Sequence, residues 1–305
     1  AMSRARVAIF YLDDSLRRST AAGEHNFIGK VADVLRASGM SVAFRANSAA
    51  ARIASALRSE YAIFHMDNPT HDRAVTMRRA YHYPFWQIEP TAERWHWHVA
   101  RSAFTPDDVD PIEARRFQNF WRKRLFAKAP PAQRGGFVYV PLQGCLTEQR
   151  SFQAASPVEM IEATLSHDAE RLVIATFHPN EVYSESERQA IHNLAAQNPR
   201  LSFQTGEMES LLPRCDYIVT QNSSAAFNGL LFNKPILLFA RSDFHHIAAN
   251  VHALGVAEAF RAVQHLTPDS AAYLWWFWQK MAVNAGRPEA EDQIRASLQR
   301  VGWPV

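Results

Sequence analysis

The chain has 305 residues, of which 47% are hydrophobic and 21% are charged, so an intrinsically disordered chain is excluded and two domains are expected. The formal net charge of +3, from 33 basic and 30 acidic residues, is too small to indicate nucleic acid as a partner. A pI of about 9.0 nevertheless suits a small anionic ligand.

Cys145 and Cys215 are the two cysteines, and they lie far apart in the sequence. That spacing argues against a disulfide scaffold and against a zinc site, and it favours a reducing compartment. The sequence has no apolar run of membrane-spanning length and no apolar N-terminal signal region. We therefore expect a cytoplasmic protein.

The first part of the chain alternates between strand and helix patterns. Strands are expected at 6–11, 41–45 and 61–65, and helices at 26–38 and 49–59. This βαβαβ order is typical of a parallel sheet. Between 71 and 126 the sequence becomes aromatic and basic, and helices can be assigned there only loosely.

A linker rich in proline and glycine is predicted at 129–136, and the alternation restarts after it. The order of the elements predicts a second doubly wound sheet. The expected strands are 137–141, 172–177, 201–204, 217–220 and 236–239, and the expected helices are 157–165, 186–197, 207–212 and 224–232. Two more helices are expected at about 267–285 and 288–300, the first rich in aromatic residues.

We therefore predict an α/β protein with two Rossmann-type domains whose parallel sheets face a cleft. The predicted N-terminal domain is 1–128 and the C-terminal domain is 137–262. Helices in 263–305 are expected to pack back on the N-terminal domain, with peripheral membrane contact by their aromatic residues as the alternative. Ligands of open α/β sheets bind at the carboxyl ends of the strands, so candidate residues are sought there.

Two strand ends of the second domain carry residues suited to an anion. His178 and Pro179 follow the strand at 172–177, where an imidazole can donate a hydrogen bond to a phosphate oxygen. Asn222, Ser223 and Ser224 follow the strand at 217–220 and begin a helix, where hydroxyl and backbone N–H groups attract anions. The alternatives are a histidine that only hydrogen-bonds at a loop entrance and a serine that only caps the helix.

These motifs carry a resemblance to a known family. The order Pro-Leu-Gln at 141–143, His-Pro at 178–179, Asn-Ser-Ser at 222–224 and Asn-Lys-Pro at 233–235 resembles the capsule polysaccharide biosynthesis family. That family consists of GT-B glycosyltransferases and includes Kdo transferases that use CMP-Kdo. The His-Pro pair and the serine-rich helix start also resemble bacterial CMP-sialic acid transferases of the GT-B type.

The resemblance implies that the nucleotide-sugar donor contacts Gln143, His178, Pro179, Asn222, Ser223 and Ser224. His245, after the last strand of the second sheet, is a further candidate for the donor pocket, although adjacent His245 and His246 are also compatible with a plain surface loop. The sequence departs from the family pattern at Asn228 and Asn233, where an acidic residue and a glycine are usual, and it lacks the aspartate after Pro-Leu-Gln.

A catalytic base is expected in the first domain. Asp13 and Asp14 follow the first strand and resemble the paired acidic motif of the CMP-sialic acid transferases. Two adjacent carboxylates on a turn cannot both face the same way, and Asp14 is the preferred candidate of the two. Glu24 and His25, before the next helix, form a second candidate pair. Each of these residues is also suited to capping a helix or forming a turn.

The aromatic region from Tyr83 to Trp97 is a candidate acceptor site, since aromatic rings stack on sugars, and core packing is the alternative. His96 and His98 would share one face of a strand, but no nearby acid or cysteine completes a metal shell, so no metal is expected.

The predicted function is transfer of Kdo or a related acidic sugar from a CMP-sugar donor to a glycan or glycolipid acceptor, in the cytoplasm or at the inner face of the membrane. No cofactor beyond the donor is expected, and the oligomeric state stays open. The alternatives are a GT-B enzyme that uses a UDP- or GDP-sugar and a relative that binds sugar nucleotides without catalysis.

Overall fold

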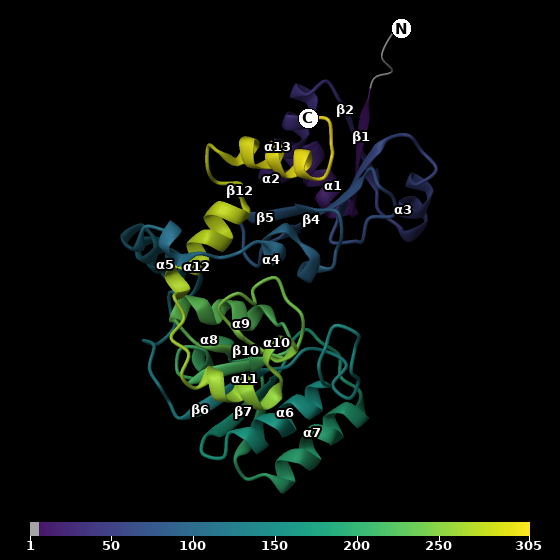
Figure 1. The fold of residues 1–305 in the computed structure, drawn as a ribbon. Helices are drawn as coiled ribbons and strands as arrows, with labels where there is room; N and C mark the ends of the chain where they lie inside the picture. The colour runs from purple at the N-terminus through teal and green to yellow at the C-terminus, as the bar shows by residue number, and fades with distance from the viewer. Residues whose placement is uncertain (1–5) are drawn as a thin grey trace. The chain divides into compact units, whose positions relative to one another are not determined.

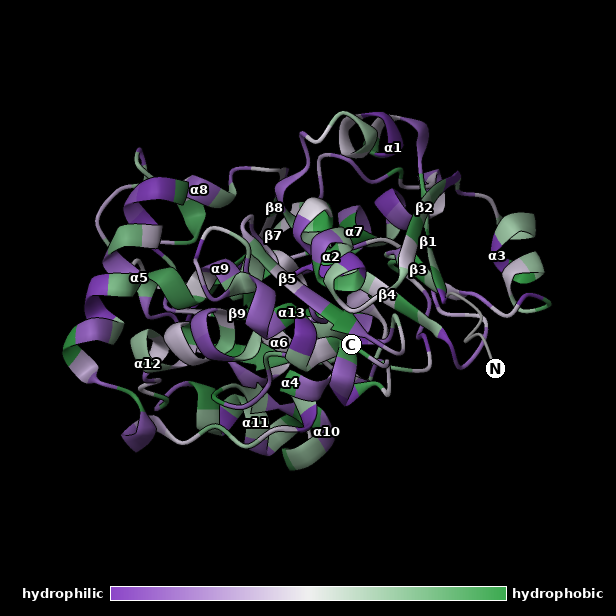
Figure 2. Ribbon diagram, turned by 90° about the horizontal axis from the view of Figure 1, so that it is seen from above, coloured by the Kyte–Doolittle hydropathy of each residue, from purple (hydrophilic) through white to green (hydrophobic). Residues whose placement is uncertain are grey.

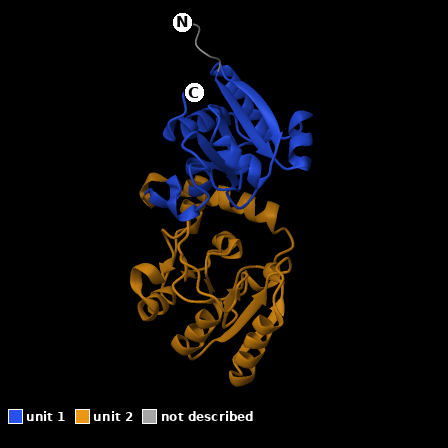
Figure 3. Ribbon diagram, turned by 90° about the vertical axis from the view of Figure 1, so that its right-hand side faces the viewer, with its two compact units in different colours: residues 1–102, 277–305 blue, residues 103–276 orange. Residues whose placement is uncertain are grey.

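The computed structural model describes residues 6–305, which form two compact α/β units (Figures 1 and 3). Unit 1 contains the residues up to Ser102 together with Phe277–Val305, and unit 2 is Ala103–Trp276. The first boundary lies before the one predicted at 128. The reason is helix α5 (Pro111–Leu125), which packs on α12 (Ser270–Leu274) and the 3₁₀ turn η3 (Leu230–Phe232) of unit 2.

Unit 1 is built on a sheet that has six strands within the described residues, in the order β12-β5-β4-β3-β1-β2. The pairs β2–β1, β1–β3 and β3–β4 are parallel, whereas β5 is antiparallel to both β4 and β12. The strands are β1 (Val7–Leu12), β2 (Ser41–Ala46), β3 (Tyr61–His65), β4 (Ala74–Arg79), β5 (Phe85–Glu89) and β12 (Val283–Asn284).

Alternating side chains of the first sheet enter two apolar layers because successive strand residues point to opposite faces. Ala8, Phe10 and Leu12 of β1 pack on one face with residues of helices α2 (Asn26–Ala37) and α13 (Ala290–Arg300). On the other face Ile9 and Tyr11 pack in a smaller cluster that reaches α3 (Ala49–Ser55). The helix predicted at the end of the chain therefore packs on the first sheet.

Unit 2 contains a fully parallel sheet, again with six strands in the part of the chain that the structure describes, in the order β11-β10-β9-β6-β7-β8. The strands are β6 (Phe137–Pro141), β7 (Leu172–Phe177), β8 (Leu201–Thr205), β9 (Tyr217–Thr220), β10 (Ile236–Leu238) and β11 (Ala249–Asn250). Two such sheets agree with the predicted fold class.

One face of the second sheet is covered by α6 (Pro157–His167), α7 (Glu185–Gln197) and α11 (Val256–Val263), whose apolar residues share a core with Val138 and Val140 of β6. The opposite face carries Ile218 of β9, against which helix α9 (Ser224–Gly229) packs. A Cβ atom on Gly229 would overlap Ile218 Cδ1, so the helix approaches this strand closely because residue 229 lacks a side chain.

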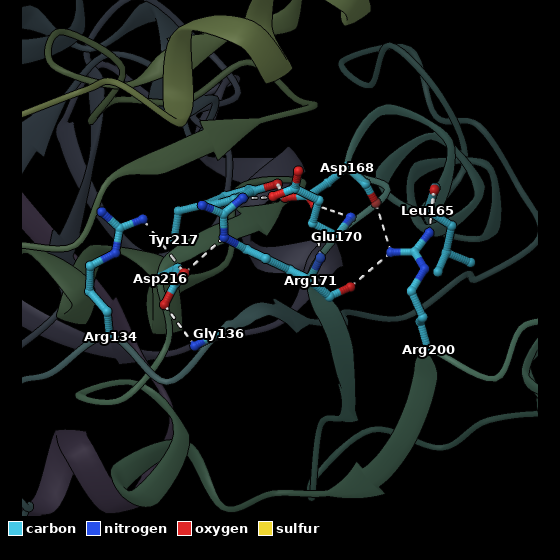
Figure 4. A network of polar contacts seen from close by, with 9 residues as sticks. All are labelled: Arg134, Gly136, Leu165, Asp168, Glu170, Arg171, Arg200, Asp216 and Tyr217. Atoms are coloured by element: carbon cyan, nitrogen blue, oxygen red, sulfur yellow. Dashed lines mark hydrogen bonds and ion pairs between the residues drawn. The ribbon is translucent and has the colours of Figure 1, made fainter.

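A polar network ties the amino ends of β6 and β9 to the start of β7 (Figure 4). Arg171 donates from Nε to Asp216 Oδ2 and from Nη1 to Asp168 Oδ2, both at 2.8 Å, and Tyr217 donates its hydroxyl to Asp168 Oδ2 at 2.8 Å. Gly136 donates its backbone N–H to Asp216 Oδ1. The network joins three segments that are far apart in the sequence.

The aromatic tail differs from the single helix predicted at 267–285. Helix α12 ends at Leu274, a π-helical turn follows at Trp275–Met281, and β12 then joins the first sheet. Tyr273, Trp276 and Trp278 are buried, so these aromatic residues are core residues and are not available to a membrane surface. None of the helices in residues 6–305 combines the length and the apolarity that a membrane-spanning helix requires.

Candidate functional site

The carboxyl ends of β6, β7 and β9 border a pocket of about 480 Å³ in unit 2. Its lining residues come from β6 and β7 and the residues that directly follow them, from the start of α9 after β9, and from the segment after β8, which includes the first turn of helix α8 (Met208–Leu211). They are Tyr139, Pro141, Leu142, Thr176, Phe177, His178, Pro179, Gly206, Glu207, Met208, Glu209, Ser223, Ser224, Ala225 and Asn228. The pocket thus brings together four residues predicted for the donor: His178, Pro179, Ser223 and Ser224.

His178 is exposed at the pocket, and two hydrogen bonds fix its position. Its backbone N–H donates to the Tyr183 hydroxyl at 2.9 Å, and its Nδ1 accepts from the Asn180 backbone N–H at 3.1 Å. Because Nδ1 accepts, the ring proton of the neutral imidazole resides on Nε2. Nε2 is therefore a hydrogen-bond donor that is suited to a phosphate oxygen.

The two serines at the start of α9 have different roles. Ser223 is buried, and its Oγ accepts from the Ala225 backbone N–H at 3.2 Å, so it caps the helix. Ser224 is exposed at the pocket, and its hydroxyl and backbone N–H make no hydrogen bond within the described residues. Because α9 has only six residues, its dipole adds little, and Ser224 offers mainly these two donors.

Tyr139 is a further donor at the pocket that sequence reasoning missed. Its hydroxyl accepts from Thr176 Oγ1 at 3.3 Å, which leaves its own proton for a ligand. Burial raises the pKa of Tyr139 to about 12, so the hydroxyl stays protonated at neutral pH. The signal in the sequence was weak because Tyr139 stands within the apolar strand Phe137–Pro141.

Two carboxylates also line the pocket, Glu207 and Glu209 in the segment after β8. Both residues are exposed. The pocket therefore combines hydrogen-bond donors for an anion with acceptors suited to hydroxyl groups, which is the combination that a nucleoside phosphate requires.

Gln143, Asn222 and His245 lie outside the residues that line the pocket. Gln143 and Asn222 bind each other, with Gln143 Nε2 donating to Asn222 Oδ1 at 3.2 Å and the Asn222 backbone N–H donating to Gln143 Oε1 at 3.3 Å. This pair links the loops after β6 and β9. The His245 ring stacks on His246 at 4.2 Å, and its Nδ1 lies 3.1 Å from the Ser242 carbonyl oxygen.

In unit 1 the predicted acids lie around helix α1 (Asp14–Ala21), which the sequence did not predict. Asp13 caps this helix, because its Oδ1 accepts from the Leu16 backbone N–H at 2.8 Å. Asp14 is exposed and pairs with Arg17 at 3.0 Å. Glu24 is exposed between α1 and α2.

His25 caps α2, since its Nδ1 accepts from the Ile28 backbone N–H at 3.1 Å, and its ring contacts Trp86 at 5.7 Å. His65, at the carboxyl end of β3, contacts the same indole at 6.2 Å. Burial lowers the pKa of both histidines, and Arg79 lowers both further, while Asp13 acts in the opposite direction on His65. His65 and Arg79 thus join Asp13 and His25 in one polar cluster that sequence analysis found only in part.

The aromatic region at 83–97 is divided between core and surface. Trp86 and Trp97 are buried, whereas Tyr83 is 47% exposed. His96 ends a 3₁₀ turn and His98 begins helix α4 (His98–Arg101), so the two residues do not share a strand as predicted. Within residues 6–305 no group of three or more His, Cys, Asp or Glu side chains is arranged to hold a metal ion.

No protein family and no curated protein matches the sequence. Among solved structures, the chain is similar to the β-Kdo 2,7 transferase of Thermosulfurimonas dismutans KpsC, with a TM-score of 0.51, 10% identity and 88% of each chain covered. It is also similar to the β-Kdo 2,4 transferase of KpsC from the same organism, with a TM-score of 0.49, 13% identity, and 88% of this chain and 91% of that chain covered. The first likeness is one of fold, and it agrees with the GT-B-like architecture of two Rossmann-type units.

Proposed function

We propose that the protein is a glycosyltransferase whose unit 2 binds a CMP-sugar donor and which transfers Kdo or a related acidic sugar to a glycan or glycolipid acceptor. One observation carries the proposal: three residues, His178, Ser224 and Tyr139, present hydrogen-bond donors to the same pocket at the carboxyl ends of β6, β7 and β9. Donors that are already in position stabilise the negative charge that develops on a leaving phosphate. Glu207 and Glu209 are the proposed partners of the ribose hydroxyls.

The proposed base lies in the unit 1 cluster. The sequence favoured Asp14, but Asp14 pairs with Arg17 at an exposed position. Asp13 is the proposed base instead, because its charge acts on the pKa of His65, which means that it lies beside this cluster. The neutral imidazole of His65, whose pKa burial lowers, is an alternative proton acceptor. His25 is less suited to this role, because its Nδ1 already accepts a backbone N–H of α2 and its Nε2 therefore carries the ring proton. In this proposal the base removes the proton of the acceptor hydroxyl as the sugar leaves the phosphate.

Nucleotide binding is tested by thermal stabilisation and calorimetry with CMP, UDP and GDP. We expect CMP to stabilise the protein and His178→Ala to weaken CMP binding by about 10- to 100-fold, the range for a hydrogen bond to a charged group. His265→Ala is the matched control, since His265 is an exposed histidine of unit 2 that does not line the pocket. Equal CMP affinity in both variants would remove His178 from the site.

The two serines provide a second control. Ser224→Ala should weaken CMP binding without changing the stability of the free protein, because its side chain makes no internal hydrogen bond in the described residues. Ser223→Ala should also destabilise the free protein by about 1 kcal/mol, because it removes the helix cap.

Catalysis is tested with CMP-Kdo. Transfer or slow donor hydrolysis by the intact protein, lost in Asp13→Asn, would support the enzyme. Binding of CMP-Kdo without either reaction would favour a sugar-nucleotide-binding protein, and stabilisation by UDP or GDP in place of CMP would identify a different donor class.

A further inference from the structure

Helix α5 and the residues that follow it concentrate positive charge. Residues 111–128 contain six basic residues and one acidic residue, Glu113, in a chain whose formal net charge is +3. The six are Arg115, Arg116, Arg122, Lys123, Arg124 and Lys128. The remaining residues therefore have a small negative net charge, and this segment alone makes the net charge of the chain positive.

One side of α5 is fixed to the body of unit 2. Ala114, Gln118 and Trp121 are buried, and Gln118 Nε2 donates to the Leu230 carbonyl oxygen at 2.8 Å and to Asn233 Oδ1 at 2.9 Å. These bonds join the helix to η3 and to the residue that ends it. The helix is thus held in a fixed orientation on unit 2.

The outer side of α5 combines basic and large apolar side chains, and Figure 2 shows hydrophilic and hydrophobic residues alternating along the helix. Ile112, Arg116, Phe120 and Lys123 follow one another at helical spacing and form one stripe. Ile112 is 62% exposed and Phe120 is 56% exposed. These two side chains supply an apolar component on an otherwise basic face, as in helices that lie at a membrane interface.

The positive charges of this segment are not neutralised within the protein. None of the six basic side chains forms an ion pair with an acidic residue among residues 6–305. Arg122 donates to the amide oxygen of Asn119, and Arg124 lies over the Trp121 ring, so both keep their charge. A hollow of about 340 Å³ adjoins the end of the helix and is lined by Arg122, Lys123, Phe126, Pro130, Pro131 and Phe232, among others.

We propose that the outer face of α5 docks the protein on the surface of an anionic lipid bilayer. The basic side chains would contact lipid phosphates, while Phe120 and Ile112 would enter the boundary between headgroups and acyl chains. A symmetric dimer through this face is disfavoured, because it would oppose two strongly basic faces. Nucleic acid would satisfy the charges but would offer Ile112 no apolar environment.

The test is vesicle binding by the full chain. We expect binding to vesicles of phosphatidylcholine with about one third phosphatidylglycerol, and little binding to phosphatidylcholine alone. The triple variant Arg116→Gln, Lys123→Gln, Arg124→Gln should weaken binding roughly 100-fold, since each basic residue contributes about fivefold. Phe120→Ser should weaken it about tenfold.

The control removes the same charge elsewhere, with Arg18→Gln, Arg58→Gln and Arg287→Gln, which are exposed arginines on other segments. Its binding should match that of the unaltered protein. The proposal would be overturned if both triple variants weakened binding equally, if the protein bound neutral vesicles as well as anionic ones, or if it did not bind anionic vesicles at all. It would also be overturned by tighter binding to duplex DNA, or by a dimer that Phe120→Ser dissociates.

This inference does not depend on the proposed donor site. CMP should stabilise the α5 triple variant as much as the unaltered protein, and an unchanged far-UV spectrum shows that the variant is folded. Loss of vesicle binding with intact CMP binding therefore tests α5 alone, and loss of CMP binding in His178→Ala tests the nucleotide pocket alone.

Discussion

Arg171→Met would leave the carboxylates of Asp168 and Asp216 without the guanidinium that bridges them. The two carboxylate side chains are only 2% and 7% exposed, and Arg171 itself is 17% exposed. Removing one partner of a buried ion pair costs about 3–5 kcal/mol, because an uncompensated charge stays buried. We expect a value near 3 kcal/mol, at the lower end of this range, because other partners remain. Asp168 keeps its bonds from the Tyr217 hydroxyl and from the backbone N–H groups of residues 170 and 171. Asp216 keeps its bond from Gly136 and its ion pair with Arg134 at 3.5 Å.

The loss should depend on pH. Burial alone would raise the pKa of Asp168 and that of Asp216, but hydrogen bonds that include those from Arg171 lower both overall. A carboxyl whose pKa is lowered by folding stabilises the protein above its unfolded pKa of about 3.9, and this stabilisation is lost as the pH falls through the folded pKa. In Arg171→Met both pKa values rise, so protonation relieves the buried charges and the difference between variant and unaltered protein narrows from pH 7 toward pH 4.

Amide hydrogen exchange in β6 and β7 is the suitable assay, because it reports the opening free energy of unit 2 in a chain with two compact units. Arg171→Lys serves as a control that keeps a positive charge but cannot bind both carboxylates in the same geometry, so an intermediate loss is expected. A loss under about 1 kcal/mol, or a loss that is the same at pH 7 and pH 4, would refute the account of a buried, charged bridge.

Two further predictions concern packing and thiol reactivity. Gly229→Ala should lower the stability of unit 2 by about 1–3 kcal/mol, because the new methyl group overlaps Ile218 Cδ1. In Gly29→Ala the new methyl group in α2 meets no atom within 4 Å, and the variant should stabilise unit 1 by up to about 1 kcal/mol. If Gly229→Ala and Gly29→Ala shifted the melting temperature in the same direction, the packing argument would be wrong. Cys145 is exposed, whereas Cys215 is buried and burial raises the pKa of its thiol to about 12. A thiol reagent should therefore modify one cysteine in the native protein and both in denaturant, and rapid native modification of Cys215 would be the contrary result.

Five of the six strands that the described part of the second sheet contains were predictable, most of them as short apolar runs between polar turns. Strand β11 (Ala249–Asn250) was missed because two residues carry no pattern. The prediction at 172–177 coincides with β7 and that at 217–220 with β9. Helix α1 was missed because its sequence, DSLRRSTA, has one large apolar residue, Leu16, and therefore no helical apolar pattern. Strands β4 and β5 were missed because their aromatic and basic residues obscure the alternation of apolar and polar residues that marks a strand. Their place in the sheet depends on pairing with neighbouring strands, which the sequence does not show.

The candidate site was predictable where the carboxyl-end rule applies. His178 and Ser224 follow different strands, and the parallel order of β6, β7 and β9 brings them to one pocket. Tyr139 could not be found in this way, because residues on both faces of its strand are apolar and the sequence does not show which face borders a ligand. His65 lies at the carboxyl end of β3, as Asp13 lies at that of β1. The carboxyl-end rule, applied to the third strand, would therefore have identified His65.

The discontinuity of unit 1 has a consequence for biosynthesis. Strand β12 and helix α13, which complete its sheet edge and one of its apolar layers, are translated only after the whole of Ala103–Trp276 has been made. Unit 2 is one uninterrupted stretch of chain, so it can form its native core before β12 has been made. Until β12 is made, the edge of β5 that pairs with it stays unpaired. Chains that are truncated after Trp276 and released from the ribosome should therefore contain a protease-resistant unit 2 and a protease-sensitive amino-terminal segment.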